Sequence, residues 1–87
     1  MMKEEWDQIT SMDVYEAVKI FDETMPKHPS AKTTFLIVND RLYPAKHIRG
    51  MAYEVHFGRE IKKSDYTGGI ETIKFFQNLG FKTKHTK

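Results

Sequence analysis

Apolar residues recur at helical spacing near the start of the chain. They occupy positions i, i+3, i+4, i+7 and i+11, which places them on one face of a helix, and they are Val14, Ala17, Val18, Phe21 and Met25. Thr10 or Ser11 can cap the start of this helix, with Asp13 in its first turn, and Pro26 cannot continue it. The pattern therefore predicts an amphipathic helix followed by a loop, "PKHPSAKT".

The next segment has the pattern of a β-hairpin. Residues 33 to 38 are β-branched or aromatic at every position except Leu36, which favours a strand. Asn39 and Asp40 suit the left-handed conformations of a tight turn, and residues 41 to 43 then return as a second strand. Pro44 ends that strand and suits the beginning of a helix, because its missing amide is no loss there.

A second helix is expected directly after Pro44. Its predicted buried stripe consists of Ile48, Met51, Ala52 and Val55. The same spacing leaves a basic and aromatic set on another face, made of Lys46, Arg49 and Tyr53. Gly50 lies inside the helix and permits a close neighbour.

A third helix is predicted from about Gly69 to Leu79. Ile73, Phe76 and Leu79 point inward at helical spacing, and Gly80 suits the left-handed position that ends a helix. The following "FKTKH" can add a third short strand. The expected fold class is therefore α+β, in the order α-β-β-α-α-β, with three helices on a short, mostly antiparallel sheet.

Composition sets the broad class of the protein. The 87 residues suffice for one small domain, 1–87, in which we expect an N-terminal arm over 1–9 and a basic tail over 84–87. Cysteine is absent, which excludes disulfides and thiolate metal sites. The longest apolar run, "FLIV", is far too short to span a membrane. We expect a soluble, cytoplasmic domain whose short edge strand allows pairing with a second copy.

Charge is distributed unevenly along the chain. The formal net charge is only +2, but from residue 41 onward ten Lys and Arg stand against four Asp and Glu, which gives that half a net charge of +6. A basic half of this kind can face a polyanion such as nucleic acid.

A search for catalytic chemistry finds only weak candidates. The four histidines lack the spacing of metal ligands, so no metal site is expected. Asp40 with Glu60 and Lys62 faintly resembles the two acids and lysine of metal-dependent nucleases, but Glu60 and Lys62 lie in a predicted loop. Nucleophile elbows and phosphate-binding loops are absent. We therefore predict no enzyme activity, no catalytic residues and no cofactor.

Two surfaces remain as candidates for binding. The first is the start of the third helix, where the amides around Thr67, Gly68 and Gly69 can hold a phosphate, with Lys62 and Lys63 just upstream. A purely structural interpretation is that Asp65 or Thr67 caps this helix and that the glycines allow close packing. The second surface is the Lys46, Arg49 and Tyr53 face, which can lie along a nucleic-acid backbone or be ordinary solvated surface.

Several landmarks resemble a known family. "LYPAK" ends the strand pair, "DYTGGIET" begins the third helix, and "LGF" ends it. This order resembles the N-terminal head module of McrA-type restriction endonucleases that act on modified DNA, over about residues 9–83. Ala45 stands where the "YPPK"-like motif of the family has a second proline. Within these 87 residues the sequence offers no nuclease or modified-base recognition domain beside this module.

The resemblance implies a non-catalytic, DNA-associated accessory module of a restriction or defence system that contacts the nucleic-acid backbone. The positions that it marks are Tyr43, Lys46, Thr67, Gly68, Gly69, Glu71 and Thr72. An alternative is a small adaptor or mobile-element-encoded inhibitor that binds a nuclease or another defence protein. DNA binding predicts an affinity that falls steeply with salt, whereas protein binding predicts a modest dependence on salt.

Overall fold

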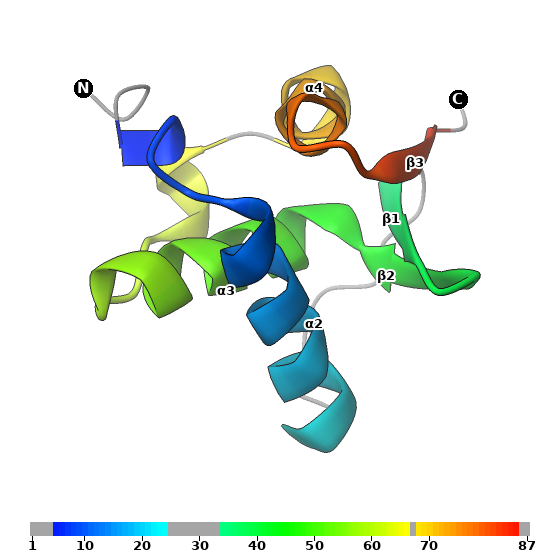
Figure 1. Cartoon of the computed structure of the whole chain (residues 1–87). Helices are drawn as coiled ribbons and strands as arrows, with labels where there is room; N and C mark the ends of the chain where they lie inside the picture. Colours follow the sequence, from blue (N-terminus) through cyan, green and yellow to red (C-terminus); the bar gives the residue numbers. More distant parts are fainter. Residues whose placement is uncertain (1–4, 25–33, 67, 86–87) are drawn as a thin grey trace.

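The computed structural model describes residues 5–24, 34–66 and 68–85, apart from the side chain of Lys63 (Figure 1). Residues 5 and 6 are helical. The later elements are α2 (Ser11–Thr24), β1 (Thr34–Val38), β2 (Arg41–Pro44), α3 (Ala45–Phe57), the 3-10 turn η1 (Lys63–Asp65), α4 (Gly69–Asn78) and β3 (Lys82–His85). This order confirms the predicted α+β arrangement. Met25 and the predicted loop that follows it lie outside the described residues.

The three strands form one antiparallel sheet in the order β2-β1-β3. Leu36 lies at its centre, opposite Tyr43 on one side and Thr83 on the other, and is fully buried. Asn39 and Asp40 have φ values of 52° and 66°, which are the left-handed conformations predicted for the hairpin turn. The sheet therefore has one central strand and two short edge strands.

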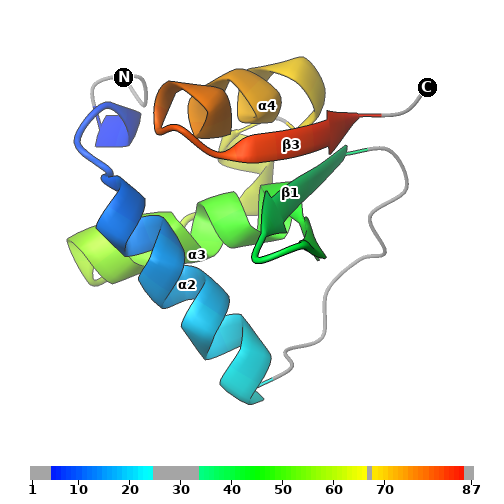
Figure 2. The ribbon, with the colours of Figure 1, turned by 45° about the vertical axis from the view of Figure 1, so that its right-hand side comes forward.

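Helices cover the sheet unevenly. α2 and α3 pack against each other, α3 also packs against β1, and α4 lies along β3 (Figures 1 and 2). The largest fully buried side chains come from all of these layers: Phe76, Leu36, Ile48, Val14 and Thr72. None of the helices within the described ranges is long and apolar enough to cross a membrane.

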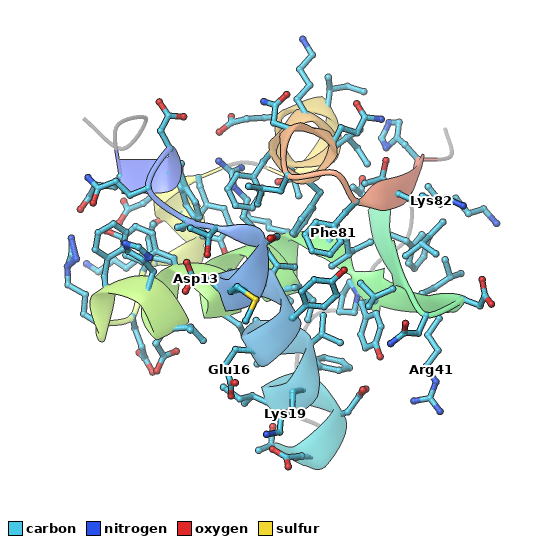
Figure 3. The ribbon with its side chains drawn as sticks, viewed as in Figure 1. Asp13, Glu16, Lys19, Arg41, Phe81 and Lys82 are labelled. Carbon is cyan, nitrogen blue, oxygen red and sulfur yellow. The ribbon has the colours of Figure 1, made fainter. Side chains whose placement is uncertain are left out.

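The sheet edges carry charged residues. Lys82 and Lys84 are exposed on the edge strand β3, and Arg41 is exposed at the start of the other edge strand, β2. Figure 3 shows Arg41 and Lys82 pointing away from the body of the domain. Charged side chains disfavour edge-to-edge pairing of sheets. Pairing with a second copy of the chain stays a prediction.

The first residues of the domain are part of its core. Trp6 and Ile9 are 6% and 2% exposed, so the description of residues 1–9 as an arm was wrong for this part. The indole of Trp6 packs against Tyr53, Tyr66 and Phe75 at centroid distances of 5.0 to 5.5 Å. Residues 84 and 85 likewise belong to β3 and not to a tail. Large aromatic side chains bury whenever a complementary surface exists, and this surface is assembled from distant segments.

The end of α4 follows the predicted pattern. Gly80 has a φ of 88°. Its amide donates to the carbonyl of Gln77, and the amide of Phe81 donates to the carbonyl of Phe76. These two hydrogen bonds form a Schellman motif, which satisfies carbonyls that would otherwise lack partners at the helix end. Phe81 then packs onto Phe76 and Tyr15.

Thr10 begins α2 as predicted, in a reciprocal cap with Asp13. The amide of Thr10 donates to Asp13 Oδ2 (2.9 Å), and the amide of Asp13 donates to Thr10 Oγ1 (3.4 Å). Asp13 Oδ2 also lies 2.9 Å from Nδ1 of His56 on α3. Burial acts to raise the pKa of Asp13, but the hydrogen bonds from Thr10 and His56 outweigh it and hold this pKa below its ordinary value of 3.8.

Replacing Asp13 by asparagine should lower the free energy of unfolding by about 1 kcal/mol at neutral pH, because the cap loses its charged acceptor. A carboxyl whose pKa is lower in the folded state stabilises the fold above its ordinary pKa and loses this effect as pH falls. Urea unfolding of both proteins should therefore show a difference that is constant above pH 3.8 and shrinks below it. A difference that is independent of pH would contradict this role of the charge.

Candidate functional site

Arg49 is a buried residue at the centre of the domain and not part of an exposed face. Its side chain extends from α3, and the residue is 2% exposed. Nη1 donates to Thr72 Oγ1 (3.1 Å), and Nη2 donates to Glu71 Oε1 (3.0 Å). The acid and the threonine that follow the double glycine therefore fix the first turn of α4 to α3.

Aromatic rings surround the guanidinium of Arg49. Its central carbon lies 4.1 Å from the ring centroid of Trp6, 5.1 Å from that of Phe75 and 5.4 Å from that of Tyr66. A desolvated guanidinium over an aromatic face is attracted by the negative face of the ring. Burial lowers the pKa of Arg49, and Glu71 opposes the shift. The Arg49 guanidinium remains a cation, and its contacts connect α3 with the N-terminal segment at Trp6 and with α4.

Tyr53 and Tyr43 are also structural. Tyr53 is 2% exposed and packs between Trp6 and Phe57, at centroid distances of 5.0 and 4.6 Å. Tyr43 is 4% exposed, and its hydroxyl lies 3.0 Å from each carboxylate oxygen of Asp22. Burial, together with this carboxylate, raises the pKa of Tyr43.

The prediction that α3 exposes a basic and aromatic face was therefore wrong for Arg49 and Tyr53. α3 is covered along a second side, by the N-terminal segment around Trp6 and by α4. The helical spacing of apolar residues indicated only the side that faces α2 and the sheet. Of the three predicted residues on this face, Lys46 alone is less than fully buried.

Lys46 lies beside the start of α4. A Cβ atom on Gly68 would be 3.5 Å from Cδ of Lys46, so the lysine stem runs directly along the glycine. Nζ of Lys46 lies 5.2 Å from the ring centroid of Tyr66. The structure thus brings together two separately predicted binding features, Lys46 and the double glycine.

The structural setting of Gly68 differs from that of Gly69. Gly68, and not Asp65, is the N-cap residue of α4. Glycine has no side chain with which to cap the helix. Gly69 has a φ of 61°, a conformation that residues with a Cβ rarely adopt. A Cβ on Gly69 would meet no atom within 4 Å. Backbone conformation, and not close packing, therefore accounts for Gly69.

The remaining predicted residues lie upstream of α4. Lys62 is exposed and precedes η1, and its carbonyl accepts a hydrogen bond from the amide of Asp65. The backbone of Lys63 belongs to η1, but its side chain lies outside the described part of the chain. Thr67 also lies outside the described residues. Their predicted contribution to binding stays a prediction.

Tyr66 connects η1 to α3. Its hydroxyl donates to the carbonyl of Lys46 (3.1 Å), and a Cβ on Gly50 would overlap the same hydroxyl. Gly50 therefore admits Tyr66, which confirms the prediction that this glycine permits a close neighbour. Burial raises the pKa of Tyr66, and the nearby positive charge of Arg49 opposes the shift.

The acids of the nuclease-like pattern do not converge. Asp40 lies in the turn before β2, whereas Glu60 follows the far end of α3. α3 lies between these positions in the chain, and its 13 residues make it roughly 20 Å long, at about 1.5 Å per residue. Within residues 5–24, 34–66 and 68–85, no group of three or more His, Asp or Glu side chains is placed to hold a metal ion.

Trp6 is the residue that sequence reasoning missed. It contacts both Arg49 and Phe75, which makes it central to the site, yet it lies in a segment without helical periodicity. The signal in the sequence was the residue type. Trp6 is the sole tryptophan of the chain, and leaving so large an apolar side chain exposed would cost stability in so small a domain.

Comparison with known proteins identifies one family. Searches of curated proteins and of solved structures found no match. The family described as the ScoMcrA-like, N-terminal head domain matches residues 7–85, which confirms the resemblance carried by the "YPAK", "TGGIET" and "LGF" segments. The match extends from the residue after Trp6 to the end of β3, and thus over nearly the whole described fold. The chain therefore belongs to the family of N-terminal head domains of ScoMcrA-like restriction enzymes.

Proposed function

We propose that this head domain is a non-catalytic, DNA-associated module that contacts the phosphate backbone. The observation that carries the proposal is the position of Lys46 along Gly68, at the start of α4. The first amides of a helix have no partners within the helix, and the helix dipole makes this end positive. A lysine next to such amides is a common arrangement for holding a phosphate.

The charges around this end of α4 are compatible with an anion. Glu71 lies in the same first turn, but its carboxylate pairs with the Arg49 guanidinium at 3.0 Å, so its charge is balanced locally. Lys62 is exposed just upstream. The half of the chain that contains all of these residues has a net charge of +6. A polyanion approaching α4 therefore meets a favourable field.

The proposed contact is to phosphates and not to bases. Lysine acts as a mobile point charge, and helix amides bind phosphate oxygens, so neither group reads a base sequence. We therefore propose sequence-independent binding, with any reading of modified bases left to other domains of the restriction enzymes that carry this head.

Binding should weaken when Lys46 is replaced by glutamine. Fluorescence anisotropy of a labelled duplex of about 20 base pairs would measure this at several salt concentrations, and the slope of log affinity against log salt should become shallower by about one. Lys19→Gln is the matched control. Lys19 is exposed on α2 (Figure 3), and its substitution removes one positive charge, as Lys46→Gln does. The control should reproduce the slope of the unchanged protein.

Two results would overturn the proposal. One is the absence of duplex binding by the unchanged protein at low salt. The other is an equal loss of affinity in Lys46→Gln and Lys19→Gln, because equal losses would report general charge and not a site at α4. The first result would favour the second candidate function, binding of a nuclease or another defence protein.

A further inference from the structure

A hollow of about 330 Å³ opens between the N-terminal segment, α3 and α4. The N-terminal segment (blue) and α4 (orange) lie side by side in Figure 2. Trp6 and Phe75 line the hollow, with ring centroids 5.5 Å apart and nearly perpendicular planes. This volume is near the lower end of ligand pockets, about 300 Å³, and suits one side chain better than a large cofactor.

Carboxylates dominate the charge of this hollow. Asp7, Asp65 and Glu71 all line it and are exposed, whereas Lys74 is the single exposed cation among the described residues that line it. Arg49 also lines it, but its side chain is 3% exposed and hydrogen-bonded to Glu71 and Thr72. Because Arg49 and Glu71 balance each other, Asp7, Asp65 and Lys74 leave a net negative charge on the lining residues that the structure describes.

An arginine side chain combines the two properties that this hollow would select. Its methylene stem and planar guanidinium pack on aromatic rings, and its five N–H groups match carboxylates in a bidentate manner. Phe75, which is half-buried, and the small exposed part of Trp6 (6% of the residue) offer the apolar wall, and the exposed Asp7 and Asp65 offer the acceptors. The same aspartates would repel phosphate and carboxylate ligands.

We propose that this hollow is a docking site for an arginine side chain on the surface of a protein partner. The site would be distinct from the DNA contact, which uses Lys46 and the first amides of α4. A head domain with both sites would bind a partner protein by a charged and aromatic anchor, while it holds a nucleic-acid backbone elsewhere. Anchors of this type supply a large share of the binding energy in protein interfaces.

Trp6 provides a direct readout, because it is the sole tryptophan of the chain and lines the hollow. Titration with N-acetyl-arginine-N-methylamide should change the tryptophan fluorescence in a saturable manner, at roughly millimolar concentration for a single isolated side chain. The blocked citrulline derivative has the same length and no charge, and should bind at least about tenfold more weakly. Blocked glutamate should leave the spectrum unchanged.

The protein variants separate the site from general charge. The double variant Asp7→Asn, Asp65→Asn should weaken arginine binding at least about fivefold, because both aspartate carboxylates are lost. Asp40→Asn is the matched control, since Asp40 is exposed in the distant β1–β2 turn, where asparagine also tolerates a positive φ. This control should bind blocked arginine as the unchanged protein does.

Three outcomes would overturn the proposal. They are equal binding of blocked arginine and blocked citrulline, equal binding by the double variant and the unchanged protein, and displacement of blocked arginine by a DNA duplex. The last outcome would assign the hollow to nucleic acid. An unaltered thermal unfolding midpoint of the double variant would show that a lost fluorescence response reports binding and not unfolding.

Discussion

Replacing Arg49 by alanine should lower the free energy of unfolding by about 3 kcal/mol, the lower end of the range for a broken buried pair. The change removes the hydrogen bonds to Glu71 and Thr72 and the packing of the guanidinium on Trp6. The lower end applies because the side chain of Glu71 is 55% exposed and water can solvate its carboxylate once Arg49 is gone. Urea unfolding followed by circular dichroism would measure the loss.

Arg41→Ala is the matched control for this experiment. The side chain of Arg41 is 71% exposed and lies 4.0 Å from Asp22, so its removal should cost less than about 1 kcal/mol. Similar losses in the two variants would show that Arg49 is not a structural centre. In DNA-binding tests, charge reversal at Arg49 would therefore report unfolding, whereas substitution of Lys46 tests the proposed contact.

Gly50→Ala should lower the free energy of unfolding by about 2 kcal/mol, although alanine is the better helix former. A new Cβ would overlap the hydroxyl of Tyr66, which is 6% exposed and hydrogen-bonded to the Lys46 carbonyl. Overpacking costs up to about 3 kcal/mol, and the gain in helix propensity returns about 1 kcal/mol. Thermal and urea unfolding of the variant would test this sign.

Tyr66→Phe should largely remove the effect of the Gly50 substitution. The change deletes the overlapping oxygen, and by itself should cost about 1 kcal/mol for the lost hydrogen bond. In the Tyr66→Phe background, Gly50→Ala should be close to neutral, so the double-mutant cycle should give a coupling energy of about 2 kcal/mol. Additive losses would mean that Gly50 is required for a reason other than the Tyr66 hydroxyl.

The motif that marks this family has a clear structural role at several positions. Glu71 and Thr72 bind Arg49, Tyr66 binds the start of α3, and Gly69 adopts a positive φ. These residues assemble α4 against α3, and so they also place Gly68 beside Lys46. The same contacts that stabilise the domain therefore build the surface that we propose for DNA.

The sequence by itself determined the local structure. The start of α2 at Thr10, the turn at Asn39 and Asp40, and the end of α4 at Gly80 all agree with prediction. Each depends on residues within a few positions of one another, so backbone conformation and short-range hydrogen bonds suffice to specify it. The helical stripes likewise indicated one buried side of each helix.

Only the tertiary structure decided which other surfaces are covered. Arg49 and Tyr53 have the spacing of a solvated face, but Trp6, from more than 40 positions earlier, covers them together with α4. The approach of Lys46 to Gly68 and the acidic hollow beside Trp6 also join segments far apart in the chain. Periodicity within a helix shows that a side is buried against something. It contains no information on which distant segment buries a second side.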